Sequence, residues 1–156
     1  MKPEIIKIIK EKAAEFGIDS DLVQAFVIVE SSGNPLATRY EPNFYKRYIL
    51  PLLKSGEITQ EEATGRSTSW GILQIMAQVA REKGFKETFE TLLIPEVGLH
   101  WGLKHLKRFI NKYPETLDDA IASYNAGSPR KRQTGEYINQ QYVGKIHKYL
   151  NQIKEV

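Results

Sequence analysis

The sequence predicts one all-α domain over residues 1–156, in which short helices surround a central apolar helix. The chain has 156 residues, of which 41% are hydrophobic and 26% charged, so it holds enough apolar material for a single compact core. Apolar residues recur at helical spacing along most of its length. Between Leu22 and Val29 the only polar residue is Gln24, and a helix that is apolar on nearly all sides is one that other helices enclose.

The first two helices are predicted at residues 3–16 and 20–30. The first is amphipathic, and Pro3 suits its first turn while Gly17 suits its end. Asp19 and Ser20 offer N-caps for the second helix, which is the apolar one. We therefore expect residues 3–16 to cover part of the helix at 20–30.

Residues 36–69 are predicted to be mostly irregular, with two short helices. One spans 43–54 and is kinked or broken at Pro51, since proline has no N–H to donate. The other starts at Thr59, with Glu62 in the capping-box position. No strand is predicted anywhere in the chain. The remaining elements are expected to be a polar loop at 65–69, a helix at 70–83, a short helix or turn at 86–93, a basic loop at 130–136, and helices at 95–112, 117–125 and 137–153.

Composition excludes several classes of function. A net charge of +3 is too small to predict binding to nucleic acid without a concentrated basic patch. The absence of cysteine rules out disulfides and thiolate chemistry. His100 and His105 do not have the spacing of two metal ligands on one helix face, and no Gly-rich phosphate loop occurs. We expect no metal, no cofactor, no transmembrane segment and a monomer.

Glu30 stands at an unusual helix end. It closes the apolar run, and Gly33-Asn34-Pro35 prevents the helix from continuing. The partial negative charge of a helix C-terminus and an apolar setting both disfavour ionisation of a carboxyl group. Both effects raise the pKa of Glu30, as a group that donates a proton near neutral pH requires. The alternative explanation is a surface glutamate at a frayed helix end.

Two further segments place a polar or aromatic side chain where an apolar run meets a small-residue turn. They are Gly71-Ile72-Leu73-Gln74-Ile75 and Ser123-Tyr124-Asn125-Ala126-Gly127. A buried Gln74 amide needs hydrogen-bond partners, which the backbone alone can supply. Taken alone, each segment is also compatible with ordinary core packing.

Together, and in this order, these segments resemble the lytic transglycosylase family of the lysozyme superfamily, which is related to goose-type lysozyme. That family has a Glu-Ser turn with a following Asn-Pro, then Gly-Leu-Met-Gln-Ile, Ala-Tyr-Asn-Ala-Gly and a late Tyr-Val. The resemblance spans roughly residues 18–150, and it departs from the family pattern at Leu73, which replaces the usual Met, and at Trp70, where a small residue is usual. The counterparts in this chain are Glu30-Ser31 with Asn34-Pro35, Gly71–Ile75, Ser123–Gly127 and Tyr142-Val143.

The resemblance implies a lysozyme-like fold, a peptidoglycan glycan strand as the partner, and cleavage of the MurNAc-β-1,4-GlcNAc bond. It implies that Glu30 is the catalytic acid and that Tyr142 supports Glu30 or the substrate. The expected substrate-binding residues are Ser31, Glu41, Ser69, Trp70, Gln74, Tyr124, Asn125 and Tyr142.

The same resemblance implies action on the cell wall, in the periplasm or outside the cell. Glu4 and Lys7 interrupt the apolar run that a secretion signal needs, so the export route is left open. A phage endolysin and a trimmed precursor both agree with this N-terminus.

Two chemistries are open for such an enzyme. In a lytic transglycosylase, Glu30 protonates the glycosidic oxygen and then takes a proton from the C6 hydroxyl of the same MurNAc, which closes a 1,6-anhydro ring. Hydrolysis needs a second carboxylate. No Asp occurs between residues 31 and 69, and among the glutamates there only Glu41 has aromatic and arginine neighbours, in the segment Arg39–Tyr45. That segment is similar to one in some phage-type muramidases.

We favour transglycosylation by Glu30 alone, with a hydrolytic muramidase that uses Glu30 and Glu41 as the alternative. A third hypothesis, of another class, is a non-catalytic helical module that binds the cell wall, since a fold does not determine a function.

Overall fold

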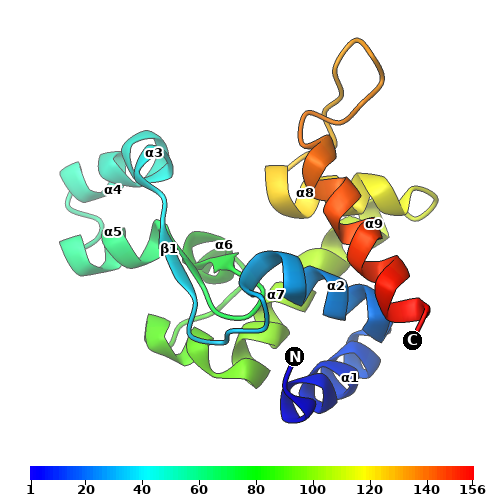
Figure 1. The fold of residues 1–156 in the computed structure, drawn as a ribbon. Coiled ribbons are helices and arrows are strands. Elements are labelled where there is room, and N and C mark those ends of the chain that lie inside the picture. The colour runs from blue at the N-terminus through cyan, green and yellow to red at the C-terminus, as the bar shows by residue number, and fades with distance from the viewer.

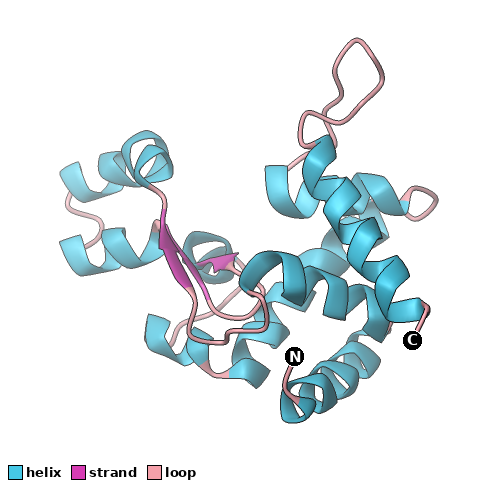
Figure 2. Cartoon of the chain, viewed as in Figure 1, coloured by secondary structure: helices cyan, strands magenta, loops and turns pink.

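A computed structural model describes residues 1–156 and shows a mainly helical chain with one small sheet (Figures 1 and 2). The predicted all-α class is confirmed, but the sheet was not predicted. The strands are β1 Thr38–Tyr40, β2 Thr68–Trp70 and β3 Ile75–Met76. The helices are α1 Pro3–Phe16, α2 Ser20–Ser31, α3 Pro42–Phe44, the π-helical η1 Tyr45–Ile49, α4 Leu50–Lys54, α5 Gln60–Arg66, α6 Ala77–Glu82, the 3₁₀-helical η2 Phe89–Leu93, α7 Pro95–Lys112, α8 Leu117–Ala126 and α9 Gln140–Lys154.

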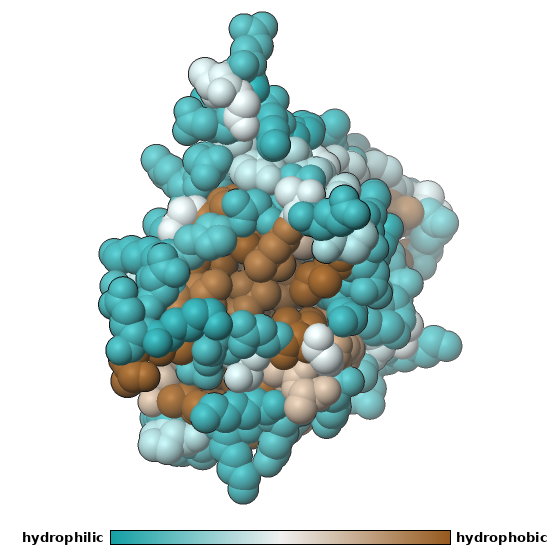
Figure 3. Space-filling view, turned by 90° about the vertical axis from the view of Figure 1, so that its right-hand side faces the viewer, coloured by the Kyte–Doolittle hydropathy of each residue, from teal (hydrophilic) through white to brown (hydrophobic).

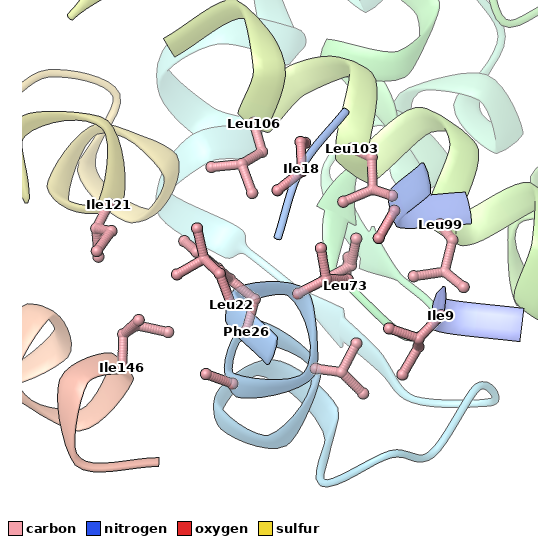
Figure 4. Packing of buried hydrophobic residues seen from close by; sticks show 14 of the residues in the cluster. Ile9, Ile18, Leu22, Phe26, Leu73, Leu99, Leu103, Leu106, Ile121 and Ile146 are labelled. Carbon is pink, nitrogen blue, oxygen red and sulfur yellow. The ribbon is translucent and has the colours of Figure 1, made fainter. Parts of the chain in front are cut away.

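Helix α2 lies at the centre of the main core, as its apolar sequence predicts. All its residues from Leu22 to Val27 are buried, Gln24 included. Phe26 points into the cluster that α1, α7, α8 and α9 complete (Figure 4). The core side chains that Figure 4 labels are Ile9, Ile18, Leu22, Phe26, Leu73, Leu99, Leu103, Leu106, Ile121 and Ile146.

Both ends of α2 follow from local sequence. The Asp19 carboxylate accepts a hydrogen bond from the backbone N–H of Asp21 at 3.0 Å, which confirms the predicted N-cap. At the other end Ser32 and Gly33 have φ angles of 54° and 79°, in the left-handed region that ends helices. Glu30 is therefore the residue before the last in α2, close to the predicted end.

The prediction of a helix over 70–83 is wrong in its first half. Residues 68–76 form a strand, a tight turn and a second strand, and only α6 is helical. Gly71 and Gln74 have positive φ angles of 79° and 49°, which no α-helix contains. The sheet is antiparallel in the order β1-β2-β3, with Arg39 opposite Ser69 and Trp70 opposite Ile75.

The segment between β1 and β2 forms a helical lobe, on the left in Figure 1. The helix predicted at 43–54 is confirmed, since α3, η1 and α4 follow one another over this region. The turn before Pro51 is π-helical. Pro51 has no N–H to donate to the carbonyl four residues earlier. The N–H of the preceding residue, Leu50, donates to Tyr45 O five residues back, which is the π-helical spacing. The predicted cap of the next helix is confirmed, since Thr59 accepts from the Glu62 N–H at 3.2 Å.

The polar loop predicted at 65–69 is not a loop. Gly65 and Arg66 complete α5, and residues 68–70 form β2. Arg66 and Arg81 both bind Glu62, at 2.6 and 3.0 Å, so this ion-pair group connects α5 to α6. A second, smaller core lies beside the sheet. It contains Ile75, Ala77, Ala80, Phe85 and Leu92.

The C-terminal half matches the prediction except at the start of the last helix. Helix α9 begins at Gln140 rather than at 137, because Tyr137 pairs with Lys131 in an isolated β-bridge. The basic loop between α8 and α9 projects from the molecule, at the top in Figure 1. Figure 3 shows the adjoining face, on which apolar residues gather in a hollow that hydrophilic residues surround. No helix combines the length and the hydropathy needed to cross a bilayer.

Candidate active site

A cleft of about 1230 Å³ lies between the helical lobe and the helices α8 and α9. The end of α2 and strands β2 and β3 contribute to its floor. The helical lobe supplies one side, and α8, α9 and the loop between them supply the other (Figure 1). Seven of the nine residues predicted for the site line this cleft, namely Glu30, Glu41, Ser69, Gln74, Tyr124, Asn125 and Tyr142.

Glu30 is half-buried in the cleft, at the C-terminal turn of α2. Burial raises the pKa of Glu30 from 4.5 to about 7, against the opposing effects of a hydrogen bond from Tyr142 and the charge of Arg39. Removal from water disfavours the carboxylate more than these two groups stabilise it. The carboxyl group is therefore partly protonated at neutral pH, as the apolar helix end predicts.

Tyr142 reaches Glu30 from the last helix. Its Oη donates a hydrogen bond of 2.5 Å to Glu30 Oε2. Burial and the neighbouring Glu30 raise the pKa of Tyr142 well above its ordinary value, so the phenol keeps its proton. A fixed O–H donor stabilises the ionised form of the carboxyl group.

The Tyr142→Phe variant should shift the pH profile of the cell-wall cleavage that the sequence resemblance implies. Removing the donor takes away a stabiliser of the carboxylate, so the pKa of Glu30 rises further above 7. Activity that needs protonated Glu30 should then be lost at a pH about one unit higher than in the wild type. Tyr149→Phe is the matched control, because Tyr149 lies on the same helix outside the cleft. An unchanged alkaline limb in Tyr142→Phe would contradict the role given to this bond.

The turn between β2 and β3 is held by side chains from distant elements. Gln74 Nε2 donates to Ala37 O and to Gly71 O, both at 2.9 Å. These bonds use both amide hydrogens and leave Oε1 as an acceptor at the cleft. Tyr124 Oη donates to Leu73 O at 2.6 Å, so α8 is tied to the same turn. The backbone partners expected for a buried Gln74 are present.

Ser31 is placed differently from the prediction. It does not line the cleft. Its hydroxyl lies 2.8 Å from Ile72 O and 3.2 Å from Val27 O, so it connects the end of α2 to the turn. We therefore propose a positioning role for Ser31 instead of contact with substrate.

Trp70 also lies outside the cleft lining. Its indole Nε1 donates to Gly65 O at 3.0 Å, and its ring stacks on Phe89 with centroids 5.7 Å apart. It packs against the second core cluster. Trp70 was expected among the substrate-binding residues, but its ring packs the sheet against η2, so we propose a packing role for it instead.

Asn125 and Ser69 line opposite parts of the cleft. Asn125 Oδ1 accepts from Asn139 Nδ2 at 2.9 Å, a partner that was not predicted. Ser69 is 8% exposed, and its hydroxyl is 3.0 Å from Met76 Sδ. Sulfur is a weak acceptor, so this hydroxyl is able to exchange that contact for a better one.

Glu41 lines the cleft next to Arg39, whose Nε lies 3.2 Å from Glu41 Oε1. Arg39 also lowers the pKa of Glu30, so its charge acts on both carboxyl groups. Because Arg39 is largely exposed, with 76% of its side chain accessible, its pairing with Glu41 contributes little to stability.

The cleft also contains residues that sequence reasoning did not select. His105 lies beside Tyr124, with ring centroids 5.5 Å apart, and burial lowers the pKa of His105 to about 4. It is therefore neutral at pH 7. Phe44 and Tyr48 line the side formed by the helical lobe. The sequence signal that could have identified them is the i, i+4 spacing of the two aromatic residues close to Glu41. His, Asp and Glu side chains form no group of three that could hold a metal ion.

Acid-catalysed cleavage of a glycosidic bond uses a carboxylic acid with a raised pKa, and Glu30 has this property in the cleft. Residues 7–147 match the family model described as the transglycosylase SLT domain. The chain belongs to this family, which confirms the resemblance stated above and makes the fold lysozyme-like. At the level of the family, the activity is cleavage of glycosidic bonds in peptidoglycan. No solved structure matches the chain significantly.

Proposed function

We propose that residues 1–156 act as one domain that cleaves the MurNAc-β-1,4-GlcNAc bond of peptidoglycan by lytic transglycosylation, with Glu30 as acid and then as base. The observation that carries this proposal is the Glu30 carboxyl group, which lies in the cleft, receives the Tyr142 hydrogen bond and has its pKa raised to about 7. A group with a pKa near the working pH serves both roles well.

In the first step, protonated Glu30 donates its proton to the glycosidic oxygen. The bond between C1 of MurNAc and that oxygen breaks, and the GlcNAc side leaves with a new hydroxyl group. Positive charge develops at C1 and the ring oxygen. The Glu30 carboxylate that results keeps its hydrogen bond from Tyr142, and its negative charge stabilises the cationic sugar.

In the second step, the C6 hydroxyl of the same MurNAc attacks C1 and gives its proton to Glu30. The new C6–O–C1 link closes the 1,6-anhydro ring, and Glu30 returns to its protonated form. An internal nucleophile has an effective concentration of about 10⁵–10⁸ M. This step therefore needs no activated water and no second carboxylate.

Gln74, Tyr124 and Asn125 are proposed to line the sugar site. Gln74 offers Oε1 to a sugar hydroxyl because its N–H groups are already bonded to the backbone. Tyr124 is proposed mainly to keep the turn in place, since its hydroxyl is used on Leu73 O. Asn125 is oriented by Asn139, so its amide is ready to bind the strand.

Hydrolysis with Glu41 as the second carboxylate is the other candidate. It is favoured by one observation, which is that Glu41 lines the cleft and shares Arg39 with Glu30. Glu41 is paired with Arg39 at 3.2 Å. This pairing fits a role for Glu41 in positioning Arg39 at least as well as it fits a role as the catalytic base.

Mass spectrometry of the released muropeptides separates the two reactions. We expect wild-type enzyme to release fragments that end in 1,6-anhydroMurNAc, each lighter by one water than its hydrolysed counterpart. Glu41→Gln should give the same products, with a rate reduced by less than about tenfold. Reducing ends in the wild-type digest, with loss of activity in Glu41→Gln, would contradict transglycosylation and support the hydrolytic muramidase.

A further inference from the structure

The helical lobe presents two aromatic side chains to the cleft that no part of the proposed chemistry uses. Phe44 and Tyr48 both line the cleft, and their ring centroids are 5.0 Å apart. Tyr48 is 53% exposed. Contiguous exposed apolar surface marks a contact site, whereas single scattered residues do not, so the pairing of the two rings is the relevant feature.

Tyr48 differs from the other tyrosines of the cleft. The hydroxyl groups of Tyr124, Tyr137 and Tyr142 donate to Leu73 O, Asp119 and Glu30. Those three rings are accordingly fixed by the protein. The Tyr48 hydroxyl has no hydrogen bond to the protein, and one face of its ring is covered by Arg47, with Cζ 5.3 Å from the centroid.

The backbone keeps these two rings together. Residues four apart lie on one side of a helix, and Phe44 ends α3 just before the π-helical turn that contains Tyr48. Ile49, the next residue, is 1% exposed and turns into the lobe. One turn of backbone thus places the Ile49 side chain inside the lobe and the two aromatic rings on the cleft. Such π-helical turns are frequent at functional sites.

We propose that Phe44 and Tyr48 form a carbohydrate-binding platform for a sugar of the glycan strand beyond the bond that is cut. The C–H face of a pyranose ring is apolar and packs on an aromatic face, while its hydroxyl groups bond to a neighbouring phenol or guanidinium. The platform offers the aromatic faces through its two rings and the phenol through the Tyr48 hydroxyl, while Arg47 supports the Tyr48 ring from one face. It rests on the proposed glycan substrate, and it adds a subsite on the lobe opposite α8 and α9.

The platform makes binding depend on the length of the glycan. In this proposal a short oligomer occupies only the part of the cleft near Glu30 and makes no contact with Phe44 and Tyr48. A longer one does, and burying an exposed aromatic side chain against it should increase affinity about tenfold. Tyr48→Ala should therefore weaken the binding of long oligomers and leave that of short ones unchanged.

The test uses isothermal titration of β-1,4-linked N-acetylglucosamine oligomers, from dimer to hexamer, against the full chain with Glu30→Gln, which prevents turnover. Adding Tyr48→Ala should reduce affinity for the longest oligomers about tenfold and for the dimer not at all. Tyr48→Phe should restore most of the lost affinity, since it keeps the ring. Tyr40→Ala is the matched control, because Tyr40 is 46% exposed on the strand that leads into the same lobe but does not line the cleft.

Two results would overturn the platform. One is equal affinity of Tyr48→Ala and its parent for every oligomer, and the other is an equal loss at all lengths, which would indicate a structural defect. Neither result tests the role of Glu30. The reaction proposed for Glu30 is tested by mass spectrometry of the ends of the released muropeptides. Failure of the platform and failure of the proposed reaction are thus seen in separate measurements.

Discussion

Glu30→Gln should abolish peptidoglycan cleavage and at the same time make the protein more stable at pH 8. Loss of a general acid reduces the rate by about 10²–10⁴-fold, and glutamine has no proton to give to the glycosidic oxygen. It keeps an oxygen that accepts the Tyr142 hydrogen bond, so the local geometry should survive. Clearing of purified cell walls, followed by turbidity, measures the first effect.

The gain in stability follows from the direction of the pKa shift. The pKa of Glu30 rises from 4.5 in the unfolded chain to about 7 in the folded one, so between these values the folded protein binds more protons. Stability is therefore fully present below pH 4.5 and decreases as the pH rises through 7. Glutamine avoids this loss. At pH 8 the free energy of unfolding of the variant should therefore be about 1–3 kcal/mol higher than that of the wild type, and its melting temperature higher by several degrees.

Glu115→Gln is the control for both measurements, since Glu115 is exposed and lies outside the cleft. It should change neither clearing nor melting temperature. Full lysis by Glu30→Gln would exclude Glu30 as the acid. A wild-type protein that binds walls without releasing fragments would support the non-catalytic module instead.

Gly71→Ala should strongly destabilise the fold. Gly71 begins the tight turn between β2 and β3 that carries Gln74. Gly71 has a φ angle of 79°, and a Cβ there would collide with the carbonyl oxygen of Leu92. The left-handed conformation alone costs alanine about 1–2 kcal/mol. A clash with backbone, which has no rotamer to change, should bring the total to about 3 kcal/mol or more.

Thermal unfolding should show a melting temperature lower by about 10 °C for Gly71→Ala. Gly56→Ala isolates the conformational part, because Gly56 has a φ angle of 78° and a Cβ added there would meet no atom within 4 Å. It should lower stability by only about 1 kcal/mol. Equal effects of the two substitutions would show that contact with Leu92 has no influence.

The helices could be predicted because their signals are local. Apolar periodicity, Asp19 as a cap and Pro95 at a helix start are all present in short stretches of sequence. The sheet was missed for the opposite reason. Its strands are short, and β1 pairs with a strand about thirty residues later, from Thr38 to Trp70. Such pairing depends on tertiary context, which the short stretch Trp70-Gly-Ile-Leu does not reveal.

The site shows the same division. Glu30 and Tyr142 were selected from sequence, and their contact spans 112 positions. Ser31 and Trp70 were expected at the substrate, but their polar groups bond to Ile72 O and Gly65 O. A motif indicates which residues gather at a site. It does not indicate which of them faces the cleft, because that depends on backbone carbonyls whose positions only the folded chain defines.

The bond between Glu30 and Tyr142 also has a consequence for biosynthesis. Helix α9 is made after the other helices described above, and it both covers α2 and supplies the phenol that contacts the acid. Until α9 docks, the Glu30 carboxyl group lacks both the Tyr142 hydrogen bond and the cover that α9 gives to α2. The nascent chain therefore contains the complete Glu-Ser turn before the tyrosine that contacts its acid has been made, and the pair forms only when α9 packs against α2.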